Sequence, residues 1–417
     1  MTLQRKLFPY FIVASVLCCL AAATVPKWGF FAHKRINQLA VFTLPTELIV
    51  FYKQHIGYIT DHATDPDKRR YAVQGEAIRH FIDLDQWGKP PFAHLSRDLE
   101  VAVVQEGAMF VISSTNDTLL LYTTWPDSIG ENRELSDDAS TLKVALTIQR
   151  KPLQTLMKDV LRMQLGRTWF SLPDSAAFEV FDVSKFRFEV KGFCMKDNFT
   201  IHGVVPYILP IMQTRLTNAF RRKDVSQILK YSADIGHYIA DAHVPLHTTK
   251  NYNGQLTDQV GIHGFWESRL PELFAESDYD FFVGRAQYIQ KPLDFYWATI
   301  FKSHSYLDSV LMIEKDLSLT YPTDKQFCYE ERNNQMVRTQ CKDYAEAYNT
   351  RMNGMVEQRF RSAILSVGSI WLTCWVDAGQ PDLHDLGIFI PSLAEIKEAE
   401  ELDAKYKNGN GQGRDHE

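Results

Sequence analysis

The chain shows the apolar spacing of amphipathic helices soon after its first residues. In FFAHKRINQLAVFTL, residues 30–44, apolar side chains recur every three or four positions and so line one face of a helix. Pro45 follows directly and suits the start of the next helix, because its ring is tolerated in a first turn. We therefore expect residues 28 to about 90 to be mostly helical.

The pattern changes after Pro90 and Pro91. VAVVQEGAMFVISSTNDTLLLYTTW, residues 101–125, alternates and is rich in β-branched and aromatic side chains on both sides of a Ser-Thr-Asn-Asp turn. FEVFDVSKFRFEVKGF, residues 178–193, has the same character. Together these stretches predict a partly β insertion over about 96–198.

Helical periodicity returns over residues 206–238 and again over 336–376. The residues after Ala394 are charged and then glycine-rich, which is typical of a solvated tail. The whole pattern predicts a mainly α fold. It comprises one helical domain over residues 24–394, with the partly β insertion inside it, and a charged tail over 395–417.

The first 23 residues have the layout of a secretory signal peptide. Arg5 and Lys6 precede an apolar run from Leu7 to about Leu20, and three alanines follow at 21–23. We therefore expect export to the periplasm or the exterior and no transmembrane span in the mature chain. The alternative is an N-terminal anchoring helix, for which the apolar run is short.

In an exported protein, the close pair Cys328 and Cys341 is either a disulfide or two free thiols. The charge balance is mildly acidic, with 45 basic against 51 acidic residues. Only short basic clusters occur, such as residues 68–70. Because duplex binding relies on neutralising many phosphates, we expect no duplex-specific binding of nucleic acid.

Histidines and acids recur one helical turn apart in two stretches of the chain. In GHYIADAHVPLH, residues 236–247, His237 and Asp241 share one helix face, and the helix should end before Pro245 so that His247 can turn back towards them. In GIHGFWESRLPELF, residues 261–274, His263 and Glu267 repeat the spacing. Each pair alone is more typical of a surface pair or a core histidine, but nitrogen and carboxylate ligands in this number favour zinc.

The N-terminal helices offer further ligands. His33 follows Trp28 by five residues, and RHFIDLDQW, residues 79–87, contributes His80. TDHATDPDKRR, residues 60–70, contains Asp65 and Asp67 beside three basic residues. Charged residues crowded in this way usually form a solvated loop, but one of these acids could fold back to share a metal with His80.

As an ordered set, these motifs resemble the superfamily of zinc-dependent single-strand nucleases and bacterial zinc-dependent phospholipases C. The set is WGxxxH, a loop aspartate, HFID, HxxxDxxxxxH and HxxxE, and it covers about half of the chain. The resemblance implies a helical fold of that type and three zinc ions. Their ligands would be Asp65, His80, His237 and Asp241 for the first ion, His247, His263 and Glu267 for the second, and His33, Asp241 and the backbone of Trp28 for the third.

The resemblance also implies catalysis of phosphate ester hydrolysis by a metal-bound hydroxide. Asp65 would orient the nucleophile, and Lys68 or Arg69 would stabilise the phosphoryl oxygens. Asp67 is the alternative loop ligand, and Arg70 would then take the place of Lys68. Cleavage near residue 23 would leave Trp28 without a free amine, so the third ion would need further trimming or an altered site.

Two branches of the superfamily imply two substrate classes. Phe81 and Asp83 match positions that stack on and hydrogen-bond a nucleobase, which favours single-stranded nucleic acid or nucleotide, although Phe81 could instead be a core residue. Glu267 and its short connection to His247 resemble the phospholipase branch, whose substrate is a phospholipid head group. A catalytically inactive zinc-binding exported or surface protein is the alternative function.

Overall fold

A computed structural model describes residues 30–122, 133–134, 145–146, 150–332, 335–409 and 414. The expected signal peptide and Trp28 lie outside these ranges. Within them, no helix combines the length and apolar character needed to cross a membrane. The described chain is mainly helical, with small antiparallel sheets.

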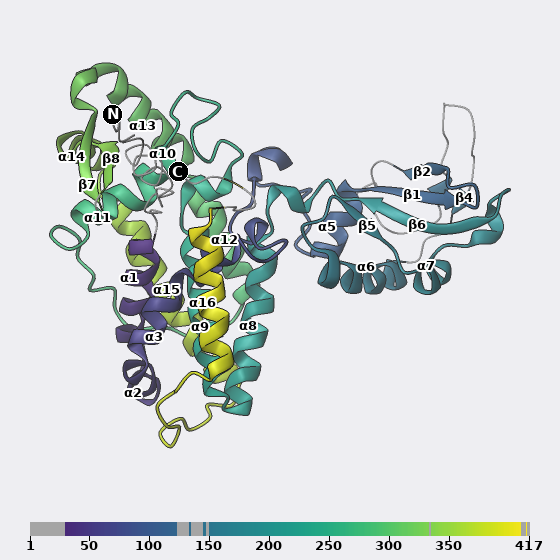
Figure 1. Cartoon of the computed structure of the whole chain (residues 1–417), viewed down its shortest axis with the longest axis horizontal. Helices are drawn as coiled ribbons and strands as arrows, with labels where there is room; N and C mark the ends of the chain where they lie inside the picture. The colour runs from purple at the N-terminus through teal and green to yellow at the C-terminus, as the bar shows by residue number, and fades with distance from the viewer. Residues whose placement is uncertain are drawn as a thin grey trace, which may run out of the picture.

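A bundle of long helices forms the body of the molecule (Figure 1). Its N-terminal part is α1 (Phe30–Ala40), α2 (Thr46–Gln54), α3 (Ile56–Asp61) and α4 (Asp65–Arg69). Helices α1, α3 and α4 pack against α9 (Val225–Ala242), and α1 also packs against α15 (Met355–Asp377). Helices α8 (Val205–Arg222) and α12 (Pro292–His304) pack against α9 and against each other. The predicted helical segment at 206–238 is thus two helices. Lys223, at a φ of 52°, ends α8, and the Asp224 carboxylate accepts a 3.1 Å hydrogen bond from the Gln227 amide to start α9.

The four-stranded sheet lies in a lobe that projects from the bundle (Figure 1). Its antiparallel strands have the order β2 (Thr118–Tyr122), β1 (Ala108–Ser113), β6 (Val190–Lys196) and β5 (Trp169–Ser171). The lobe also holds α5 (Leu99–Glu106), α6 (Arg150–Gln164), α7 (Asp174–Val180) and a short pair of β3 (Arg133–Glu134) with β4 (Ala145–Leu146). All these strands fall within the segment where the alternating pattern predicts a partly β insertion.

A second apolar core lies beside the bundle. It involves α10 (Ile262–Gly264), a π-helical turn (Phe265–Arg269), α11 (Leu270–Phe274), α13 (Leu307–Thr320) and α14 (Lys342–Arg351). A hairpin of β7 (Phe327–Arg332) and β8 (Gln335–Gln340) precedes α14. The expectation of helix from residue 336 is therefore wrong at its start, because residues 335–340 pair with β7, and helix begins at Lys342.

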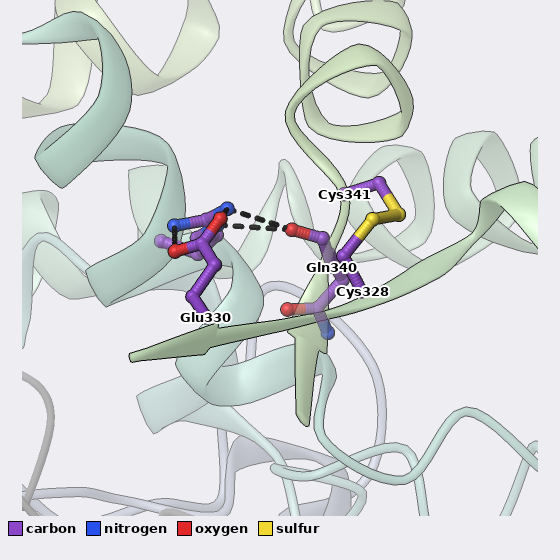
Figure 2. The surroundings of a disulfide bond; sticks show 5 residues. Cys328, Glu330, Gln340 and Cys341 are labelled. Carbon is purple, nitrogen blue, oxygen red and sulfur yellow. Dashed lines mark hydrogen bonds and ion pairs between the residues drawn. A yellow bond between two sulfur atoms is a disulfide. The ribbon is translucent and has the colours of Figure 1, made fainter. Parts of the chain in front are cut away.

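A disulfide joins Cys328 and Cys341 at the open end of this hairpin (Figure 2). Next to it, the Arg269 guanidinium donates hydrogen bonds to the Glu330 carboxylate and to the Gln340 carbonyl oxygen. Arg269 is the last residue of the π-helical turn, so the hairpin holds that turn in place.

The C-terminal segment forms a helix, α16 (Leu393–Lys407), where the sequence predicts a charged tail. Ser392 and Glu395 form a capping box that starts it. The helix contacts α4, and none of its residues is buried. It packs on the bundle as an outer layer (Figure 1).

Candidate metal centre

Helix α9 carries the first histidine and carboxylate into the interior. His237 Nε2 lies 3.2 Å from Asp241 Oδ2, one turn further along α9, and both side chains are buried. The α9 helix ends at Ala242, before Pro245, and the chain turns back so that His247 reaches the same region. The i, i+4 pairing expected for this stretch is confirmed.

His80 meets this pair from the N-terminal half of the chain. Its Nδ1 lies 3.0 Å from Asp241 Oδ2 and 3.0 Å from His237 Nε2. Ligand atoms of these three residues therefore converge on one point, and the group could hold a metal ion.

A second group of three lies next to the first. His247 Nε2 is 3.2 Å from His263 Nε2 and 3.3 Å from Glu267 Oε2, and His263 Nε2 is 2.7 Å from the same carboxylate oxygen. The backbone explains part of this spacing. His263 lies in α10 and Glu267 in the π-helical turn, which gives the carboxylate its place opposite the two rings.

Backbone carbonyls orient three of the histidines. The Nδ1–H groups of His237, His247 and His263 donate to the carbonyl oxygens of Ala63, His80 and Tyr252, at 2.9, 2.6 and 3.1 Å. Each bond fixes the tautomer and directs Nε2 into the cluster, which is how metal-binding histidines are held in proteins. No pattern in the sequence predicts these acceptors.

A third group shares its carboxylates with the other two. His33 Nε2 lies 3.5 Å from Asp241 Oδ1 and 3.3 Å from Glu267 Oε1. Asp241 therefore turns Oδ2 to the first group and Oδ1 to the third, and Glu267 turns Oε2 to the second and Oε1 to the third. The participation of Glu267 beside His33 is an addition to the expected ligands. Trp28, the remaining one, lies outside the described residues.

The local charges set the protonation of these groups. Burial alone would raise the pKa of Asp241 and of Glu267, but nearby histidines outweigh it and hold both pKa values well below the ordinary range. Burial lowers the pKa of His80 and of His263. For His237 burial acts in the same direction, but the Asp241 and Asp67 carboxylates outweigh it and raise the pKa to about 9. The two carboxylates are thus ionised, as metal ligands must be.

The structure places Asp67, the alternative loop aspartate, beside the histidines. Asp67 Oδ1 lies 3.7 Å from His80 Nδ1 and 3.8 Å from His237 Nε2, whereas Asp65 binds His62 at 2.6 Å. Both aspartates lie in the short helix α4, and a separation of two residues turns them to opposite sides of it. Asp67 therefore belongs to the cluster, and Asp65, the preferred residue, does not.

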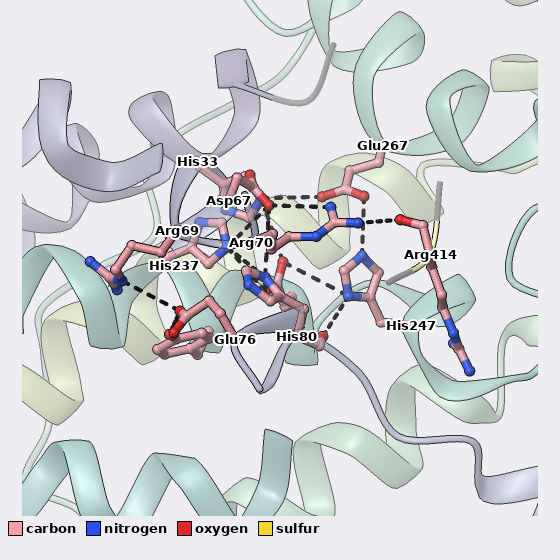
Figure 3. A network of polar contacts seen from close by, with 12 residues as sticks. His33, Asp67, Arg69, Arg70, Glu76, His80, His237, His247, Glu267 and Arg414 are labelled. Carbon is pink, nitrogen blue, oxygen red and sulfur yellow. Dashed lines mark hydrogen bonds and ion pairs between the residues drawn. The ribbon is translucent and has the colours of Figure 1, made fainter. Parts of the chain in front are cut away.

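The three basic residues that follow point in different directions. Lys68 pairs with Asp65 at 3.3 Å and with Asp403 of α16 at 2.9 Å. Arg69 points away from the histidines (Figure 3) and binds Asp234 at 3.0 Å. Arg70, the alternative, has its Nη1 3.9 Å from Asp67 Oδ1, and its Nη2 donates to the backbone carbonyl oxygen of Arg414 (Figure 3).

Phe81 and Asp83 lie next to the cluster and belong to what we call the aromatic subsite: Phe81, Asp83, Thr249 and Tyr252. The guanidinium carbon of Arg414 lies 3.5 Å from the centre of the Phe81 ring and 4.7 Å from that of Tyr252. Its Nη2 donates to Asp83 Oδ2, and its Nη1 donates to the Thr249 carbonyl oxygen at 3.2 Å. Phe81 is buried, and its ring packs against a planar polar group of the chain itself, the Arg414 guanidinium.

Comparisons of the chain with protein-family models, with curated proteins and with solved structures give no match. Function is therefore inferred from the chemistry of the site itself.

Proposed function

We propose that the protein is a zinc-dependent phosphodiesterase of the nuclease and phospholipase C superfamily that its motifs resemble. The observation that carries this proposal is the pair of three-residue groups, His80, His237 and Asp241 beside His247, His263 and Glu267, with His33 bridging their carboxylates. Two or three adjacent cation sites with a basic side chain beside them suit the binding of a phosphate ester.

Zinc is the metal that fits these ligands best. In a tetrahedral site with bonds of roughly 2.0–2.1 Å to nitrogen or oxygen, the ligand atoms lie about 3.3–3.4 Å apart. The separations in the first group are 3.0, 3.0 and 3.2 Å, and those in the second are 2.7, 3.2 and 3.3 Å. Imidazole and carboxylate without thiolate is also a ligand set that zinc accepts.

Two side chains of the chain itself would act on the substrate. The Asp67 carboxylate, whose side chain is 21% exposed, lies at the edge of the first group and would accept a proton from the attacking water. The Arg70 guanidinium would donate hydrogen bonds to the non-bridging phosphoryl oxygens as charge develops on them. Bound zinc would lower the pKa of that water and neutralise charge on the phosphate.

The aromatic subsite supports a single-stranded nucleic acid or nucleotide as substrate. Phe81 and Tyr252 offer ring faces on which an unpaired base can stack, and the Asp83 carboxylate can accept a hydrogen bond from a ring or exocyclic N–H. These walls accept a planar polar group at the distance that Arg414 occupies. A phospholipid head group would use the ring faces only through its cation. The leader expected over residues 1–23 would deliver the enzyme outside the cytoplasm.

The test combines metal content with turnover. The purified protein should contain zinc by mass spectrometry and should hydrolyse bis-p-nitrophenyl phosphate. The variant His237→Ala should lose both, whereas the control His384→Ala, which removes an exposed histidine, should keep both. Zinc binding without turnover would indicate the inactive binding protein instead. Single-stranded DNA and phosphatidylcholine then separate the two substrate classes.

A further inference from the structure

Arg414 comes from the far C-terminal end of the chain and reaches the metal centre. Its guanidinium stacks on Phe81, donates to Asp83 and lies over the Tyr252 ring. Its backbone carbonyl oxygen accepts a hydrogen bond from the Arg70 guanidinium (Figure 3). Arg414 thus contacts the two rings of the aromatic subsite, Phe81 and Tyr252, and its carboxylate, Asp83.

These contacts coincide with those proposed for the substrate. The planar guanidinium of Arg414 occupies the place of a base on Phe81, and its N–H groups donate to the Asp83 oxygen that would accept from that base. The backbone carbonyl oxygen of Arg414 accepts the hydrogen bond that Arg70 would donate to a phosphoryl group. A substrate and Arg414 cannot occupy these positions together, because each group would need the same hydrogen-bonding atoms.

Helix α16 contacts the body through ion pairs and through Tyr406, whose ring lies 5.4 Å from that of Phe30 and 5.3 Å from that of Tyr71. Lys68 pairs with Asp403 at 2.9 Å, Lys230 pairs with Glu398 at 3.5 Å, and no residue of α16 is buried. Beneath the helix lies a cavity of about 480 Å³, lined among others by Tyr58, His62, Asp65, Ile396 and Leu402. Release of α16 would therefore break ion pairs and the ring contacts of Tyr406, but it would expose no side chain of α16 that is fully buried.

We infer that helix α16 and Arg414 form an autoinhibitory strap, in which Arg414 occupies the substrate-binding positions of the metal centre. The inference rests on the proposed function, because it needs those positions to bind substrate. The strap competes with substrate within the same molecule, so it raises KM and leaves kcat at saturating substrate unchanged.

The test compares the full-length, zinc-loaded wild type with Arg414→Ala and with the control Lys397→Ala, which removes an exposed charge from the same segment. If the strap occupies the site about nine-tenths of the time, Arg414→Ala should lower KM for bis-p-nitrophenyl phosphate about tenfold, with kcat within about twofold. The control should match the wild type. Equal KM values for Arg414→Ala and the wild type, or a fall in kcat alone, would overturn the inference.

A binding measurement separates this inference from the proposed activity. A synthetic peptide with the sequence NGNGQGRDHE, residues 408–417, should bind the Arg414→Ala protein in a calorimeter, and the same peptide with alanine for arginine should not. If none of the proteins turns over substrate, the phosphodiesterase proposal fails, and this titration still decides whether the strap docks. Failure of the arginine peptide to bind would refute the docking.

Discussion

The substitution Asp67→Asn removes a negative charge from the cluster and preserves the shape of the side chain. In the structure, Asp67 Oδ1 lies within 3.8 Å of nitrogen atoms of His80 and His237. Replacing residues that only support metal ligands costs 10–100-fold in metal affinity, so the loss of a ligand should cost at least about 100-fold, or about 3 kcal/mol. We expect one zinc ion fewer per chain and loss of phosphodiesterase activity.

Asp65→Asn is the matched control, because it makes the same change two residues away. Asp65 pairs with His62 and Lys68 at the surface, where such pairs contribute about 0–1 kcal/mol, and its zinc affinity should stay within about twofold of the wild type. Both variants are dialysed against a chelator that buffers free zinc, and zinc is counted by mass spectrometry. Loss of an ion from Asp65→Asn, with a full complement in Asp67→Asn, would refute the assignment.

Four further outcomes are expected. Arg70→Ala should lower kcat about 10²–10³-fold in a phosphodiesterase assay, because it removes a donor to the charge that develops on the phosphate. Arg69→Ala should instead lower the free energy of unfolding by about 3 kcal/mol in a denaturant titration, since it removes the ion-pair partner of the buried Asp234 carboxylate; the reverse pattern would exchange the two roles. Removal of zinc with a chelator should lower the thermal midpoint, with a loss of about 4 kcal/mol where free zinc had exceeded Kd 1,000-fold, and an unchanged midpoint would argue against bound metal. The double variant Cys328→Ser with Cys341→Ser should lose about 3 kcal/mol in the same titration, because the disulfide closes a loop with a separation of 13 residues; equal stability would contradict this.

The residues that sequence reasoning placed well are those whose spacing fixes a direction. Two such pairs are His237 with Asp241 and His263 with Glu267. The members of each pair are one helical turn apart, so a helix places both side chains on the same face. Pro245 marks the end of α9 for an equally local reason, the loss of an amide donor.

The sequence does not distinguish side chains that have equivalent local patterns. Asp65 with Lys68 and Asp67 with Arg70 have the same i, i+3 spacing, and only the packing of α4 against α9 and α16 decides which pair faces the histidines. Helix was predicted from residue 336 because local periodicity does not show that residues 335–340 pair with the strand at 327–332.

The C-terminal segment was described by composition, and composition cannot place a single side chain. Charged residues and glycines indicate solvation on average, yet Arg414 reaches Phe81 through contacts with residues more than 300 positions earlier in the chain. Nothing in the order of its neighbours predicts that contact.

The shared carboxylates have a consequence for the order in which ions enter the cluster. In the third group, only the His33 imidazole is absent from the first two groups, because its two carboxylate oxygens come from Asp241 and Glu267, which are also members of those groups. Metal ions in the first two groups would fix the Asp241 and Glu267 carboxylates, so that Asp241 Oδ1 and Glu267 Oε1 would point towards His33. Without those ions, the two carboxylates could rotate. If the groups bind metal ions, occupancy of the position beside His33 would therefore depend on the other two, and this position would be the first to empty as free metal falls.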